Sequence, residues 1–168
     1  YTYAFPLVSV ARAFVLLADP AGAADAARKP LIPALTRIRD AMMAAPEMIG
    51  GSHNAPDTLI MRAKPGQIVA KGGAEGLRGI GLVAGARGAE TGPAGVAAGV
   101  AIKIEDGDGA KRANRAVTIE ALAQLHALSG ATLERLADLH RPPTVDPRGV
   151  EIAQAVPSFR LAPLSELG

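Results

Sequence analysis

The chain has 168 residues, of which 49% are hydrophobic but only 3% aromatic, and a formal net charge of +2. This length suits one domain whose core is built from Ala, Val, Leu and Ile. The lack of cysteine excludes disulfides, thiolate zinc sites and a cysteine nucleophile within the chain. Lysines and arginines form no run and do not alternate with aromatic residues, so no nucleic-acid partner is expected.

Neither terminus nor any internal stretch predicts contact with a membrane. Residues 91–102 carry the fewest charges but are too short to span a bilayer, and residues 1–18 lack the features of a signal peptide. Cytoplasm is therefore the expected compartment. The chain starts with Tyr1, directly inside sequence that looks ordered, and we expect an N-terminal truncation there.

The first third of the chain predicts two helices. Within residues 6–19, apolar side chains recur at helical spacing, and Pro6 suits a first helical turn. Residues 34–45 show the same periodicity, and Pro46 ends that helix before a glycine pair opens a loop.

The middle third predicts a short helix and three strands. Residues 57–61 begin the helix, and residues 67–71 and 77–84 form two strands of a hairpin with a glycine-rich turn. Residues 86–95 predict a long loop, because they are rich in Gly and Ala and lack periodicity. Residues 99–105 predict the third strand.

The last third predicts helices over residues 111–128 and 132–140 and a strand over residues 149–156, with a break at Arg141-Pro142-Pro143. His126 is expected to pack within the first of these helices. The order of helices, a few strands, helices and a last strand favours an α+β fold with hairpin strands over a regular βαβ series.

Lys103 is the first candidate for chemistry, because two isoleucines flank it in the third strand. A lysine buried among apolar neighbours loses its proton more easily than a solvated one, and can then act as a base. Alternation, however, places Lys103 and Glu105 on the opposite face from the isoleucines, which fits a half-exposed strand equally well. The functional interpretation requires Lys103 to face a cleft and a serine.

Lys71 is the second candidate, at the end of a strand that runs into Gly72 and Gly73. Glycines let a ligand approach the backbone, whose N–H groups can hold a carboxylate or an oxyanion. A plain hairpin turn is the alternative interpretation of the same residues.

Other patterns predict structure instead of a metal site. Asp106-Gly107-Asp108-Gly109 begins like a calcium loop, but Val117 stands at the twelfth position where that loop requires Glu, so we expect a turn with Asp108 capping the next helix. The three histidines have no metal-ligand spacing; His53, in a polar loop, is a candidate to border a site.

The motif of lysine-activated serine enzymes is missing. No Ser or Thr in the chain is followed three residues later by Lys, so the sequence has no S-x-x-K pattern. If Lys71 and Lys103 are catalytic, their nucleophile is expected upstream of Tyr1.

Several segments, taken together and in this order, resemble the bacterial L-asparaginase II family, the type first known from rhizobia. The resemblance extends over nearly all of residues 1–168 but only over the C-terminal half of the family. Its matching segments are Phe5-Pro6-Leu7 with Ala11-Arg12-Ala13-Phe14, Met48-Ile49-Gly50-Gly51, Asp57-Thr58, Ile68-Val69-Ala70-Lys71-Gly72-Gly73-Ala74-Glu75-Gly76, and Ala101-Ile102-Lys103 with Asp106-Gly107.

The resemblance implies a fold like that of serine β-lactamases and penicillin-binding proteins, with an antiparallel sheet between helical layers. Residues 1–168 would then be the C-terminal portion of a single domain, with the N-terminal half absent. The resemblance also implies hydrolysis of L-asparagine to L-aspartate and ammonia, and a homodimer. The family's zinc-binding Cys and Lys positions lie upstream, so no cofactor is expected in this chain, although zinc could bind in the full-length family member.

The resemblance assigns roles to six residues. Lys103 would partner a second serine, and Lys71 would lie where the related lactamases carry their K-[ST]-G motif. Gly72, Gly73, Ala74 and Glu75 would bind substrate, with Glu75 orienting the loop or meeting the α-ammonium group. The family often has a cysteine where Gly79 stands here, and the loop from residue 84 to 99 is longer than usual.

The expected function is therefore an asparaginase-like amidohydrolase, with this chain inactive alone because it lacks the nucleophile. One alternative is a serine hydrolase acting on β-lactams or cell-wall peptides, which the shared architecture allows. Another is a degenerate, non-catalytic binding domain.

Overall fold

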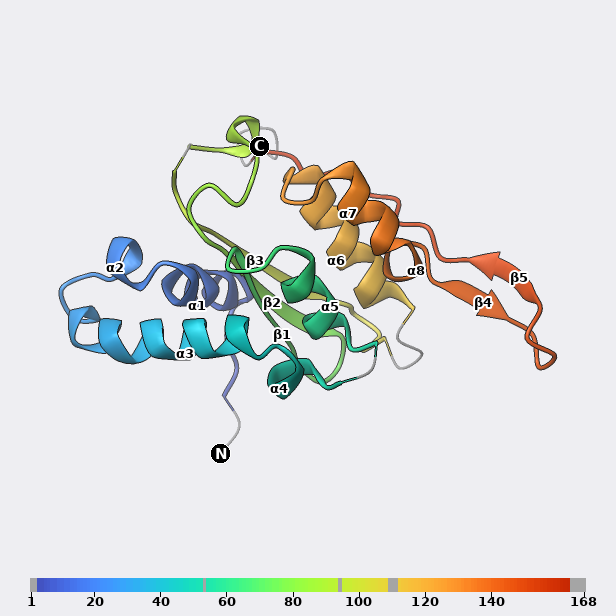
Figure 1. Cartoon of the computed structure of the whole chain (residues 1–168), viewed down its shortest axis with the longest axis horizontal. Helices are drawn as coiled ribbons and strands as arrows, with labels where there is room; N and C mark the ends of the chain where they lie inside the picture. The colour runs from blue at the N-terminus through green and yellow to red at the C-terminus, as the bar shows by residue number, and fades with distance from the viewer. Residues whose placement is uncertain (1–2, 53, 94, 109–111, 164–168) are drawn as a thin grey trace.

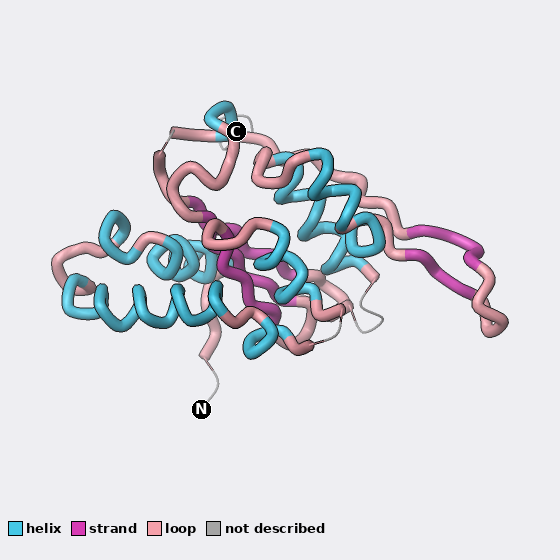
Figure 2. The backbone as a smooth tube through the Cα atoms, in the orientation of Figure 1, coloured by secondary structure: helices cyan, strands magenta, loops and turns pink. Residues whose placement is uncertain are grey.

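Three hairpin-connected strands form the centre of the molecule, in a computed structural model that describes residues 3–52, 54–93, 95–108 and 112–163. The strands β1 (Ile68–Gly72), β2 (Leu77–Leu82) and β3 (Ala98–Lys103) make an antiparallel sheet in the order β1-β2-β3. Helices cover both faces of this sheet (Figure 1, Figure 2). The α+β class expected from the sequence is confirmed.

The helices fall before and after the sheet in the chain. Their bounds are α1 Leu7–Ala18, α2 Pro20–Ala23, η1 Lys29–Leu31, α3 Ile32–Ala44, α4 Glu47–Gly50, α5 Pro56–Ala63, η2 Ala89–Thr91, α6 Ala113–Gln124, α7 Gly130–Arg135 and α8 Ala137–His140, where η marks a 3₁₀ turn. No helix in the described ranges is both long and apolar enough to cross a membrane.

The main core lies between one face of the sheet and helices α5, α6, α7 and α8. It is built from aliphatic side chains, as the scarcity of aromatic residues requires. Their burial stabilises the fold by roughly 25 cal/mol for each Å² of apolar surface removed from water. Its central members are Ile60, Met61, Ile68, Ile80, Leu82, Ile119 and Leu122, all nearly or fully buried.

Glycines let helix α1 lie directly on the other face of the sheet. A Cβ atom added at Gly79 would lie 2.0 Å from the ring of Phe14, and one at Gly99 would lie 2.0 Å from the carbonyl oxygen of Ala11. Both distances are far shorter than any real contact. The glycines of β2 and β3 therefore fix how closely α1 packs, and Phe14, Ala18, Met42 and Val69 form a second, smaller core there.

The helix and strand predictions for the first two thirds are confirmed, but two later predictions are wrong. The predicted helix over residues 111–128 is α6, which ends at Gln124; His126 has φ +52°, is exposed, and pairs with Glu90 instead of packing (Nδ1–Oε1 3.2 Å). The predicted helix over residues 132–140 is divided into α7 and α8 at Leu136, whose φ and ψ of −104° and 15° depart from helical values.

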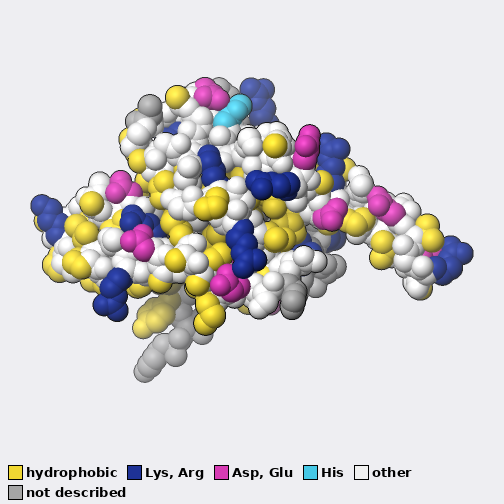
Figure 3. Space-filling view, viewed as in Figure 1, with side chains coloured by type: hydrophobic (Ala, Val, Ile, Leu, Met, Phe, Trp, Pro, Cys, Tyr) yellow, Lys and Arg dark blue, Asp and Glu magenta, His cyan; other side chains and the backbone are white. Residues whose placement is uncertain are grey.

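The last strand pairs with a partner that was not predicted. Strand β5 (Glu151–Gln154) pairs antiparallel with β4 (Pro143–Val145), and the hairpin projects from the body of the molecule (Figure 1). The two prolines predicted only a break at residues 141–143, but Pro can also be the first residue of an edge strand, as Pro143 is in β4. Hydrophobic side chains lie along this arm (Figure 3), among them Val145 and Ile152, which are 55% and 65% exposed.

Candidate functional site

The turn between β1 and β2 has a backbone that ordinary side chains rarely adopt. Glu75 and Gly76 have φ of +56° and +67°, and the turn closes through Leu77 N, which donates to Ala74 O at 3.2 Å. Two successive positive φ values suit the twist of a hairpin, but only Gly accepts them without cost. A strained Glu at such a place is a reason to look for a site.

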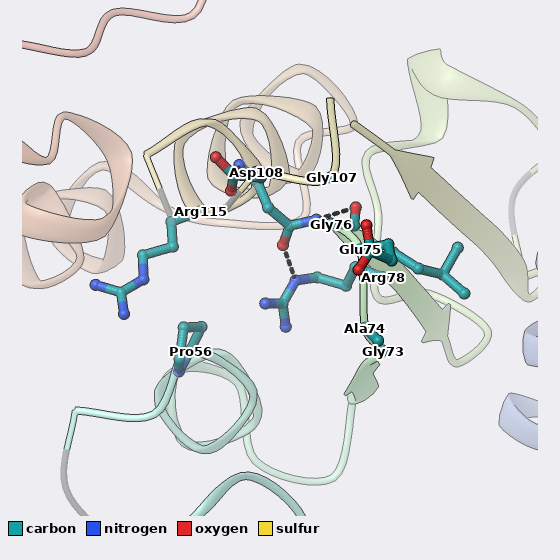
Figure 4. A pocket seen from close by; sticks show the side chains of 11 residues that line it. Pro56, Gly73, Ala74, Glu75, Gly76, Arg78, Gly107, Asp108 and Arg115 are labelled. Carbon is teal, nitrogen blue, oxygen red and sulfur yellow. Dashed lines mark hydrogen bonds between the residues drawn. The ribbon is translucent and has the colours of Figure 1, made fainter. Parts of the chain in front are cut away.

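A cavity of about 390 Å³ lies beside this turn, a volume near the lower end for small-molecule sites. The turn, the start of β2, the loop after β3 and the first residues of α5 and α6 form its walls (Figure 4). Its polar lining comes from Glu75, Arg78, Asp108, Asn114 and Arg115, and Pro56 lies across from them.

Arg78 connects the walls of the cavity through buried polar contacts. Its Nη1 pairs with Asp57 Oδ1, both side chains being more than nine-tenths buried, and its Nε donates to Asn114 Oδ1 at 2.8 Å. Asp57 Oδ2 accepts from Gly72 N at 2.7 Å, and Asn114 Nδ2 donates to Gly76 O at 2.7 Å. The two partners of Arg78 thus hold both ends of the turn.

The surroundings of Arg78 disfavour its charged form. Burial, and after it the nearby charge of Arg115, lower the pKa of Arg78 to about 10. The guanidinium stays protonated at neutral pH, because its pKa remains well above 7, and the Asp57 carboxylate compensates it.

Asp108 fixes the start of α6 at the rim of the cavity. Its carboxylate accepts from the N–H groups of Arg112, Ala113 and Asn114 at 3.0, 2.9 and 2.8 Å. Burial alone would raise the pKa of Asp108, but these three N–H groups and the charge of Arg112 outweigh it and hold the pKa below the ordinary value of 3.8. The cap predicted for Asp108 is confirmed.

Three of the predicted substrate-binding residues, Gly73, Ala74 and Glu75, line the cavity. Gly72 lies next to them, but its N–H donates to Asp57, and the N–H of Gly73 donates to Leu77 O at 2.8 Å. Within the described part of the chain, the N–H groups of Ala74 and Glu75 have no hydrogen-bond acceptor. Of these four residues, only Ala74 and Glu75 therefore have backbone donors left without an acceptor in the described part of the chain.

The two predicted catalytic lysines lie on the same face of the sheet, the face that α1 covers. The register pairs Lys71 with Gly79 and Lys103 with Leu77, two positions that point to one side. Both lysines are exposed, so the half-exposed alternative for Lys103 is the observed one, and its burial is a wrong expectation. Neither lines the cavity.

Lys103 nonetheless touches the turn. Its Nζ donates to Glu75 O at 2.5 Å and to Ile104 O at 2.6 Å, and so supports the strained residue from the other side of the sheet. Lys71 Nζ donates to the carbonyl oxygen of its neighbour Gly72 at 2.5 Å. Among the described residues, no serine or threonine hydroxyl bonds to either lysine.

The sequence analysis missed Asp57, Arg78, Asn114 and Arg115 as site residues. One signal could have found Arg78, namely a charged residue inside the otherwise apolar strand β2, which when buried requires a carboxylate partner. His53 lies outside the described residues. Across those residues, no three His, Asp or Glu side chains gather closely enough to hold a metal ion.

A cavity of this size, lined by charges of both signs at the turn of an antiparallel sheet, suits a small polar ligand. The family model described as L-asparaginase II matches residues 1–157, and the chain belongs to this family. No curated protein matches the chain significantly. Membership indicates an asparaginase-type amidohydrolase that acts on a small-molecule substrate.

Proposed function

We propose that the protein hydrolyses L-asparagine to L-aspartate and ammonia, within a fold like that of serine β-lactamases and penicillin-binding proteins. The family match over residues 1–157 carries the proposal. An antiparallel sheet between helices and a small cavity at its hairpin turn support it. Residues 1–168 are proposed to be the C-terminal portion of one domain whose N-terminal half supplies the nucleophile.

The proposed reaction begins when a serine Oγ attacks the side-chain amide carbon of asparagine. The serine proton passes to a neutral lysine amine and from there to the leaving nitrogen, which departs as ammonia. Water then attacks the acyl ester and releases aspartate. The lack of an S-x-x-K pattern, and of any described hydroxyl bonded to Lys71 or Lys103, supports a serine from outside these residues.

Lys103 is proposed to assist a second serine in relaying the proton. Its two hydrogen bonds to carbonyl oxygens fix the nitrogen beside the turn and leave one of its three N–H positions for a further partner. That remaining position is where a serine hydroxyl would bind. Since Lys103 is exposed, another segment must cover it before it can act in a water-poor environment.

The turn is proposed to bind the substrate. Lys71 with Gly72 and Gly73 was expected to hold the α-carboxylate or the oxyanion, but the two glycine N–H groups already have acceptors. The N–H groups of Ala74 and Glu75 are therefore the better oxyanion donors, and Lys71 is left to contribute charge at the end of β1.

The test is ammonia release from L-asparagine by the 168-residue chain and by the complete protein. The complete protein should release ammonia from L-asparagine, and the 168-residue chain alone should not. In the complete protein, Lys103→Ala should lower kcat by about 10²–10⁴-fold, the usual contribution of a positioned proton-transfer group.

Lys29→Ala is the matched control, because Lys29 is exposed in η1, away from the sheet. It should leave kcat unchanged. Turnover by the chain alone would refute an external nucleophile, and Lys103→Ala with the activity of Lys29→Ala would remove Lys103 from the mechanism. A complete protein that cleaves β-lactams but not asparagine would replace the proposed reaction with that of a related serine hydrolase.

A further inference from the structure

Four charged residues line the cavity, and only two of them have a partner of opposite charge in the described part of the chain. Arg78 is neutralised by Asp57, and Asp108 is bound to helix N–H groups and to Arg112. The two lining charges that remain are Arg115 and Glu75, and neither forms an ion pair within the described part of the chain. One cation and one anion are therefore left to face the cavity.

The positive end of the cavity holds two guanidinium groups. Arg115 projects from the first turn of α6, and Arg78 reaches toward the same space above Pro56 (Figure 4). Arg115 is close enough to disfavour the charge of Arg78, which is already held by Asp57. An anion in this space would be attracted by Arg115 and would relieve the repulsion between the two groups.

The negative end lies beyond Arg78, at the β1–β2 turn. Glu75 stands there with its carboxylate against Gly107, where a Cβ atom would meet Oε2 at 2.6 Å (Figure 4). The contact with Gly107 and the hydrogen bond from Lys103 to Glu75 O both restrict where this carboxylate can lie. Arg115 and Glu75 thus stand at opposite ends of one cavity, with Arg78 between them.

We infer that this cavity binds the zwitterionic end of an α-amino acid, with Arg115 holding the α-carboxylate and Glu75 the α-ammonium group. The inference rests on the proposed function and gives it a specificity determinant, Arg115. It also frees the N–H groups of Ala74 and Glu75 for the amide end of the substrate. A guanidinium suits this task because its planar donors match a carboxylate in two-point contact.

The test is calorimetric titration of the 168-residue chain with three probes that differ by one group each. L-Asparagine carries both charges, succinamate lacks the ammonium group, and L-asparaginamide lacks the carboxylate. The unmodified chain should bind L-asparagine more tightly than either of the others.

Arg115→Gln should weaken L-asparagine binding by about 10- to 100-fold, the factor for losing one hydrogen bond between charged groups, and should leave L-asparaginamide binding unchanged. Glu75→Gln should weaken the binding of L-asparagine but not the binding of succinamate, which has no ammonium group. Arg37→Gln, which removes the same charge from an exposed position on α3, is the control and should bind like the unmodified chain. Arg115→Lys should restore part of the affinity, and melting curves establish that each variant is folded.

Equal binding of L-asparagine by the Arg115→Gln and Arg37→Gln variants, or no preference of the unmodified chain for L-asparagine over L-asparaginamide, would overturn the inference. Activity separates this outcome from failure of the proposed reaction. If the complete protein releases ammonia and Arg115→Gln leaves KM unchanged, the subsite is wrong and the function stands. If the probes behave as expected but no ammonia is released, the subsite stands and the function is wrong.

Discussion

Arg78→Met removes the residue that connects the two partners holding the β1–β2 turn. Asp57 Oδ1 would be left buried without its cation, and Asn114 Oδ1 without its donor. Truncating one side of a buried ion pair costs about 3–5 kcal/mol, mostly for the charge left behind. Because Asp57 keeps its bond from Gly72 N, we expect the lower part of this range, about 3 kcal/mol.

Urea unfolding at neutral pH, followed by far-UV circular dichroism, measures the loss, and equal slopes would show that the extent of unfolding is unchanged. Asp57→Asn removes the charge but retains an acceptor for Gly72 N, so the double variant Asp57→Asn, Arg78→Met should recover part of the stability. The coupling free energy between the two sites should be about 1–3 kcal/mol. A cost under about 1 kcal/mol for Arg78→Met, or simple additivity, would refute the idea that this pair holds the turn.

Three further predictions concern other parts of the chain. Gly99→Ala should lower the free energy of unfolding by about 1–3 kcal/mol, because the new Cβ meets a backbone oxygen of α1, whereas Gly130→Ala, whose Cβ meets nothing within 4 Å, should not; equal urea midpoints would contradict this. Asp108→Ala should cost about 1–2 kcal/mol at neutral pH. Since the folded-state pKa of Asp108 lies below 3.8, that stabilisation is complete above this pH and is lost as the pH falls through the lowered value; a deficit that stays constant down to pH 2, in urea titrations across pH, would be inconsistent with it. Gln124→Ala should speed amide exchange at Leu161, whose N–H donates to Gln124 Oε1 at 2.7 Å, and unchanged protection would show that this bond does not hold the C-terminal segment.

The local signals of the sequence were sufficient where a segment determines its own structure. Strands β1 and β2 follow from two apolar segments joined by a glycine-rich turn, and the capping role of Asp108 follows from its place before a helix. Sequence-based prediction failed where a contact with a residue far away in the chain determines the structure. The buried pair of Arg78 with Asp57 joins a strand to a helix start far away in sequence, and nothing in either segment shows the other. Helix α6 was predicted too long for a different reason: apolar residues continue past Gln124, but the backbone leaves the helix and reaches a positive φ at His126.

The contact between Phe14 and Gly79 couples two positions of the chain as a single steric unit. The ring of Phe14 occupies the volume that any side chain at position 79 would need. A side chain at position 79 therefore requires α1 to move away from the sheet or the ring of Phe14 to be removed. Gly79→Cys in this chain should therefore lower the free energy of unfolding, and Phe14→Ala in the same protein should recover part of the loss because it vacates that volume.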